Sequence, residues 1–251
     1  MKNNWLELHR LWLDGVAGGE RAELAGADLT NARLTNCVLA GADLTDCVLA
    51  GADLTNARLT NARLTDCVLA GADLTNARLT NARLTNCVLA GADLTNARLT
   101  NARLTNCVLT NCVLAGADLT NARLAGADLT DCVLPNAQLN HAVLTGAVLT
   151  GAVLPHGVPV VDALDARILE RISGNGCQLN MGEWHTCETT HCRAGWAIVL
   201  AGDAGAALER KYGPSAAGAL IYAASRPGIP VPDFYCDTET ALADIKKHAT
   251  V

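Results

Sequence analysis

Residues 72–80 read ADLTNARLT and contain two copies of a five-residue pattern in which Leu follows Ala-Asp or Ala-Arg. Outward from this stretch, Leu recurs at every fifth position from Leu24 to Leu154, twenty-seven times without a gap. The residue two before each Leu is always Ala or Cys. A period of five fits neither the turn of an α-helix nor the alternation of a flat strand. The pattern therefore predicts a corner every five residues and a coil of four sides and twenty residues.

The positions of this pattern divide into an inside and an outside. Leu and the small Ala or Cys point inward, where four of each per coil fill a narrow square interior. The second residue after Leu is mostly Asn, Asp or Gly, the types that accept left-handed backbone conformations, and we expect these residues to form the corners. Coils stacked through parallel backbone hydrogen bonds about 4.7–4.9 Å apart would make a rod roughly 32 Å long.

Aromatic residues lie only near the two ends of the chain, since no Phe, Trp or Tyr occurs between Gly15 and Val161. A core without aromatic side chains requires a thin, regular cross-section. We therefore expect three parts: a helical N-terminal cap at 1–20, the solenoid at 21–155 and a small α-helical domain at 156–251.

Both ends of such a solenoid need a cover, because each coil contacts only its neighbours. Trp5, Leu8 and Trp12 have helical spacing and Gly15 ends the predicted cap helix. After the repeats, Asp237 is expected to cap a last helix that ends near His248. The other predicted helices of the C-terminal domain lie at 163–173, 194–212 and 214–225.

Short runs of the chain resemble a known family. Ala27-Asp28-Leu29-Thr30-Asn31 and Ala42-Asp43-Leu44-Thr45-Asp46 are similar to the A(D/N)LXX motif of pentapeptide-repeat proteins. The resemblance implies an all-β, right-handed quadrilateral parallel β-helix, and the C-terminal run His191 to Trp196 is similar to bacterial and phage members. In some members it implies binding to DNA gyrase by mimicry of duplex DNA. Those mimics often carry Phe at the central inward position, where this chain has Leu. The repeats are nearly identical to one another, which fits recent duplication and consensus design equally.

The outward residue before each Leu falls on one of four faces when positions are sorted modulo twenty. One face carries Val, the opposite face carries Arg58, Arg78 and Arg98, and the faces between carry Asp or Arg. Two interpretations stay open: strand-forming valines with weak surface ion pairs, or an apolar strip that supports a weak homodimer. The predicted interaction face consists of Val48, Val68, Val88 and Val108, bordered by Asp53, Asp73 and Asp93 and by Arg63, Arg83 and Arg103.

Charge disfavours a strong nucleic-acid role. The chain has a net charge of −6, and its repeats hold nine Arg against eleven acidic residues. Duplex DNA carries about one negative charge per 1.7 Å, so a mimic as long as the rod, roughly 32 Å, would need roughly nineteen negative charges. The sequence also argues against direct nucleic-acid binding, since no aromatic side chain accompanies the Arg columns.

Seven of the eleven cysteines replace Ala at the inward position, which indicates buried, reduced thiols. Cysteines stacked one coil apart would be nearly 5 Å apart at Cβ, beyond the 3.5–4.5 Å of a disulfide. No apolar leader or membrane span is seen, and a cytoplasmic location is expected.

The chemically densest run is 184–192. Its His185, Cys187, His191 and Cys192 could ligate zinc, but the spacing matches no known finger, so packing is the favoured interpretation and we expect no metal or cofactor. The leading hypothesis is a non-enzymatic, structural or protein-interaction solenoid with a protein partner. The alternatives are a DNA-mimic modulator of gyrase and a metal-binding or thiol-active C-terminal module.

Overall fold

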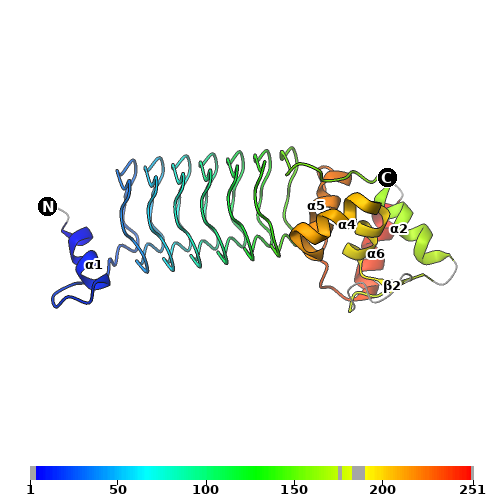
Figure 1. Cartoon of the computed structure of the whole chain (residues 1–251), viewed down its shortest axis with the longest axis horizontal. Helices are drawn as coiled ribbons and strands as arrows, with labels where there is room; N and C mark the ends of the chain where they lie inside the picture. Colours follow the sequence, from blue (N-terminus) through cyan, green and yellow to red (C-terminus); the bar gives the residue numbers. More distant parts are fainter. Residues whose placement is uncertain (1–3, 175–176, 183–189, 250–251) are drawn as a thin grey trace.

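The computed structural model describes residues 4–174, 177–182 and 190–249 of the chain. The molecule is a rod of stacked coils with one helix at its N-terminal end and a helical domain at its C-terminal end (Figure 1).

The coils are joined by single-residue parallel bridges. Each residue that precedes a repeat Leu pairs with the residue twenty positions further on, from Glu23 with Asp43 to Val133 with Val153. Because a corner follows every fifth residue, each side of a coil pairs through one residue and never extends into a regular strand. Among the described residues, the one regular sheet is a parallel pair outside the coils, formed by β1 (Gln178–Leu179) and β2 (Thr190–His191).

Backbone hydrogen bonds between coils run along the rod axis. The Leu74 N–H donates to the carbonyl oxygen of Asp93 in the next coil at 2.7 Å, and the Asp73 N–H donates to that of Ala52 in the previous coil at 3.0 Å. Within the coil, the Ala77 N–H donates to the Leu74 carbonyl at 2.9 Å and closes the corner. Most backbone amides of the solenoid are therefore satisfied without long strands.

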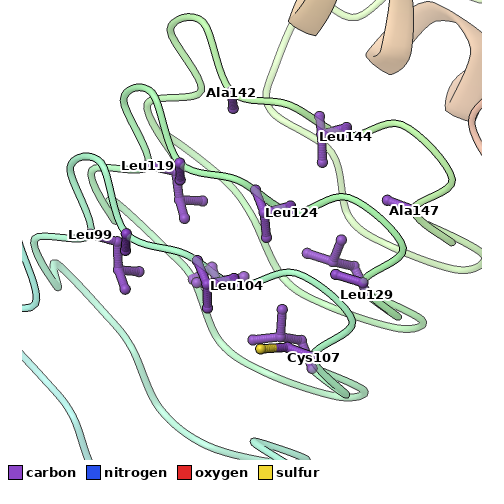
Figure 2. Close-up of a cluster of buried hydrophobic side chains, with 14 of the residues drawn as sticks. Leu99, Leu104, Cys107, Leu119, Leu124, Leu129, Ala142, Leu144 and Ala147 are labelled. Atoms are coloured by element: carbon purple, nitrogen blue, oxygen red, sulfur yellow. The ribbon is translucent and has the colours of Figure 1, made fainter. Parts of the chain in front are cut away.

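The interior is filled by stacked aliphatic side chains. Figure 2 shows Leu104, Leu124 and Leu144 above one another in successive coils, all pointing inward. Every repeat Leu from Leu34 to Leu149 is buried. The inward and outward assignment made from the sequence is confirmed over this range.

The corners use the left-handed backbone conformation that the sequence predicts. The Asn and Asp residues at the second position after Leu have φ between 55° and 61° along the whole solenoid. His141 takes the same position with φ 56°. Short polar side chains accept this conformation at low cost, which explains their repetition at the corners.

The N-terminal end is covered by α1 (Trp5–Leu13). The Nδ1 atom of buried His9 accepts a hydrogen bond from the Ala22 N–H at 3.0 Å, and the rings of His9 and Trp12 stack with centroids 5.3 Å apart. The cap therefore gives a partner to an amide of the first coil. Leu24 and Leu29 are only half-buried, so the cover is partial at this end.

The C-terminal domain continues the hydrogen bonding of the last coil. The His141 N–H donates to the Tyr212 carbonyl at 2.7 Å, and the Gly146 N–H donates to the Val231 carbonyl at 2.8 Å. The single helix expected over 194–212 is instead two helices: the first ends at Leu200, and the second begins at Gly202, which has φ 60°. The helices of this domain are α2 (Leu164–Ser173), α3 (Arg193–Leu200), α4 (Gly202–Tyr212), α5 (Pro214–Ser225) and α6 (Thr238–His248).

Candidate interaction surface

The valine face is a column of four Val residues whose backbones are bridged from coil to coil. The bridges run between Val48, Val68, Val88 and Val108 in that order. The first three side chains are half-buried, and Val108 is 37% exposed. On this face the residue after Leu is Ala and not Thr in three successive coils, at Ala50, Ala70 and Ala90. The surface is therefore apolar in two neighbouring columns.

The valine column changes face in the middle of the rod. Val108 pairs with Asp128, whereas Val113 pairs with Val133 and Val133 with Val153 on the neighbouring face. The three later valines were not identified from the sequence, although the signal is visible there. Residues 106–110 read NCVLT and 111–114 repeat NCVL, so one extra pentapeptide shifts the valine column by one side of the coil.

The aspartate face lies next to the valine face and is occupied by local hydrogen bonds. Its carboxylates accept from the backbone N–H of the Thr two residues on, at 3.0 Å for Asp53, 2.9 Å for Asp73 and 2.8 Å for Asp93. Asp53 also accepts from the Thr35 hydroxyl at 2.5 Å, and these Thr hydrogen bonds lower the pKa of its carboxyl. Asp at this position therefore satisfies an amide that the coil leaves open.

Two adjacent faces carry arginine columns beside asparagine rows. The first arginine face consists of Arg58, Arg78 and Arg98, and a cavity of about 500 Å³ runs along it. The second arginine face consists of Arg63, Arg83, Arg103 and Arg123, and a cavity of about 520 Å³ runs along its last three arginines. In the described part of the chain, one of these seven guanidinium groups has an acidic partner within 4.0 Å, namely Arg63 with Asp43 at 3.1 Å.

The repeat cysteines are packed as small apolar residues with an acceptor for the thiol. Cys67 is buried and its Sγ lies 2.8 Å from the carbonyl oxygen of Leu44, and Cys87 makes the same contact with Leu64. Burial raises the pKa of Cys47 to about 11. All described cysteines, among them the seven of the repeats, are free thiols.

A family model for pentapeptide repeats matches the solenoid in eight copies, over residues 22–61, 62–101, 97–135 and 122–156. The chain belongs to the pentapeptide-repeat family. Members of this family fold as right-handed β-helices, in agreement with the four-sided coil described above. The family match names no enzyme.

Several solved pentapeptide-repeat structures are similar to this chain. HetL, involved in heterocyst differentiation regulation in the cyanobacterium Nostoc sp. strain PCC 7120, has 28% identity and a TM-score of 0.39, covering 58% of this chain and 78% of that chain. Rfr23 from the cyanobacterium Cyanothece 51142 has 25% identity and a TM-score of 0.25, covering 58% and 95%. QnrB1, a plasmid-mediated fluoroquinolone resistance protein, has 19% identity and a TM-score of 0.37, covering 55% and 83%. No curated protein matches the chain.

The pentapeptide-repeat match ends at residue 156, before the run considered for zinc. His185 and Cys187 lie outside the described residues. Cys192 is the N-cap of α3, and its Sγ accepts from the Gly195 N–H at 3.4 Å. The His191 ring meets the Trp196 ring edge-on with centroids 4.7 Å apart. In the ranges that the structure covers, no group of three His, Cys, Asp or Glu side chains gathers as a metal site, and no helix has the length and apolarity to cross a membrane.

A buried ion cluster of the C-terminal domain was not found from the sequence. Arg193 is 1% exposed and donates to Asp165 at 2.9 Å, to Asp244 at 2.6 Å and to the Tyr222 hydroxyl at 2.9 Å. Arg226 donates to the second oxygen of Asp165 at 2.8 Å. Burial alone would raise the pKa of Asp244, but its hydrogen bond with Arg193 and the charge of that residue lower it. The cluster joins α2, α3, α5 and α6 and serves the packing of the domain.

Proposed function

We propose that this pentapeptide-repeat chain is a non-enzymatic interaction solenoid whose valine face binds a second copy of the chain. The observation that carries the proposal is the apolar strip of the valine face, which is two columns wide and lies along a straight rod. Columns of opposite charge border the strip on its two sides, with Asp53 on one and Arg63 on the other. Contiguous exposed apolar surface with a polar border is typical of a protein contact.

The borders select the relative orientation of the two copies. A two-fold axis perpendicular to the rod and lying in the face would bring each Asp column against its own copy. A two-fold axis parallel to the rod places the Asp column of one copy beside the Arg column of the other, at the same coil spacing. The parallel dimer is therefore favoured electrostatically.

The size of the strip sets the expected strength of the contact. From Val48 to Val108 it covers three coil steps, about 14 Å. Full burial of an exposed Val side chain stabilises by about 1.5–3 kcal/mol. Three of these valines are already half-buried in the single rod, so dimerisation would add less than this for each of them. Such a strip falls short of the roughly 800 Å² per partner of a standard stable interface. We expect dissociation constants nearer micromolar than nanomolar.

Sedimentation equilibrium of the full chain tests the proposal. The double variant Val68→Lys, Val88→Lys places two charges in the strip and should remain monomeric at concentrations where the wild type associates. Thr60→Lys, Thr80→Lys on the first arginine face adds the same charge elsewhere and is the matched control. A wild type that stays monomeric at high concentration, or a valine variant that associates as the wild type does, would contradict the proposal.

A further inference from the structure

The second arginine face places four like charges in register, one coil apart. Its four residues are joined coil to coil by backbone bridges from Arg63 to Arg123, and all four are exposed. Beyond Arg63, which is held by Asp43, none of them has an acidic partner within 4.0 Å in the part of the chain that the structure describes. Four stacked cations one coil apart repel one another until an anionic partner neutralises them.

The asparagine row beside this column makes the face rich in donors. Asn81 Nδ2 donates to Asn61 Oδ1 at 3.1 Å, and Asn101 Nδ2 donates to Asn81 Oδ1 at 3.1 Å. In this ladder each bonded amide oxygen already accepts one hydrogen bond, and each donating amide keeps a second N–H for a ligand. The cavity of about 520 Å³ between the row and the arginines is therefore lined by hydrogen-bond donors and positive charge.

The spacing of the donors fits an α-helix that lies along the rod. Four arginines one coil apart span three steps of about 4.8 Å, or about 14.4 Å. Helix positions i, i+3, i+7 and i+10 lie on one face and span about 15 Å at a rise of 1.5 Å per residue. Side chains on one face of an extended strand are about 6.7 Å apart and lose register with the arginines after one step.

The ends of the column limit how far the anionic partner can continue. The same column carries Glu23 and Asp43 before Arg63, and Val143 follows Arg123. A uniform polyanion such as duplex DNA would meet repulsion at the two acids. A protein helix with a short acidic run, a basic residue at one end and an apolar residue at the other matches the whole column.

We propose that the second arginine face binds an acidic α-helix of a partner protein, parallel to the rod axis, with Glu or Asp at i, i+3, i+7 and i+10. Each carboxylate lies against one guanidinium group, and the asparagine row holds the helix from one side. This contact needs a single copy of the chain and does not depend on the valine face.

Peptide titration with the full chain tests the inference. The probe is a fluorescein-labelled, alanine-rich helical peptide of about 20 residues with Glu at the four positions. The comparison peptide has the same composition with its Glu residues spread around the helix. Fluorescence anisotropy is measured at low salt and at about 0.15 M salt, at chain concentrations where sedimentation shows a monomer.

The expected result is binding of the striped peptide about tenfold tighter than the spread peptide. Arg83→Ala, Arg103→Ala should weaken it by about tenfold, as expected for two exposed charge pairs. The matched variant Arg78→Ala, Arg98→Ala on the first arginine face should change it by less than about threefold, and Val68→Lys, Val88→Lys should not weaken it. Equal binding of the two peptides, equal loss in both arginine variants, or no binding at all would overturn the inference. Tighter binding of a DNA duplex of about 16 base pairs would also overturn it.

Discussion

Val108 pairs in the parallel ladder with Val88 of the previous coil and with Asp128, not a valine, of the next coil. The Val108–Asp128 pair marks the coil where one additional pentapeptide moves the valine column by one face. The packing of the core is the same on both sides of this change, since Leu109 and Cys112 are both buried. Inner and outer faces of this solenoid are therefore specified independently, because all four sides of a coil have the same inward residues.

Deletion of residues 106–110 should produce a folded rod with one continuous valine column. Removing the extra pentapeptide returns Val113, Val133 and Val153 to the register of Val48, and the longer strip should strengthen self-association. Circular dichroism reports the fold and sedimentation equilibrium reports the association. Deletion of 107–110, which breaks the five-residue period, is the control and should destabilise the rod. Unchanged association in a folded 106–110 deletion would count against the valine face as the contact.

Leu74→Ala should lower the free energy of unfolding by about 2–5 kcal/mol. The side chain is fully buried between two coils that cannot close the cavity. The control Arg78→Ala, at an exposed position of the same coil, should stay within about 0.5 kcal/mol of the wild type. Both are measured by urea denaturation. Similar losses at the two positions would refute the inward and outward assignment.

Stability of the N-terminal cap should decrease as the pH falls below about 6.5, the ordinary pKa of His. Burial lowers the pKa of His9, whose Nδ1 must stay unprotonated to accept from Ala22. Since the folded pKa is below the unfolded one, the unfolded chain binds the proton first, and stability is lost between pH 6.5 and the lower folded pKa. NMR titration of His9 and thermal unfolding against pH measure this.

The variant His9→Asn, whose amide oxygen is bonded to Cγ as Nδ1 is in His, is the control for this titration. Its amide oxygen can accept from the Ala22 N–H at any pH, so the loss of cap stability on acidification should be reduced. A His9 that titrates at or above the ordinary pKa would contradict the buried acceptor role.

The repeat thiols should be unreactive toward a disulfide reagent near pH 8 until the rod unfolds. Cys47 has a pKa of about 11, so little thiolate forms at that pH, and the side chain is enclosed. Cys47→Ala should change stability little, because Ala occupies the equivalent inward position at Ala52 and Ala57. Rapid labelling of Cys47 in the native state, mapped by mass spectrometry, would show that the coil opens readily.

Gyrase supercoiling should not be inhibited by low micromolar concentrations of the chain. The three carboxylates of the aspartate face already accept backbone N–H groups, and Val113 ends their column. Inhibition that disappears in Asp53→Asn, Asp73→Asn, Asp93→Asn would reverse this expectation and favour duplex mimicry.

The solenoid could be predicted from sequence because its period is local. Leu at every fifth position fixes the core, and Asn, Asp or Gly at the corners fixes the left-handed turns, with no need for long-range information. The change of face at Val113 was also available locally, in the doubled NCVL run. Assigning outward residues to faces by position modulo twenty does not reveal this change, because it assumes that each column keeps one residue type along the rod.

The C-terminal domain could be predicted only as a set of helices. The helix over 214–225 and the Asp237 cap were visible from Pro and Asp as local signals. The cluster around Arg193 was not, because Asp165 and Asp244 lie far from it in sequence and meet it only after the helices pack. The break at Gly202 was overlooked because Ala-rich sequence on both sides favours helix.

The hydrogen bonds between coils all point along the rod, and this direction determines how the molecule would respond to tension. A pull on its two ends stretches these bonds lengthwise and opens one coil at a time, instead of shearing many bonds together. Each released coil of twenty residues would add about 60 Å of contour length. The rod would therefore extend in equal steps at low force, which makes it a yielding spacer under load, although it is stiff when undisturbed.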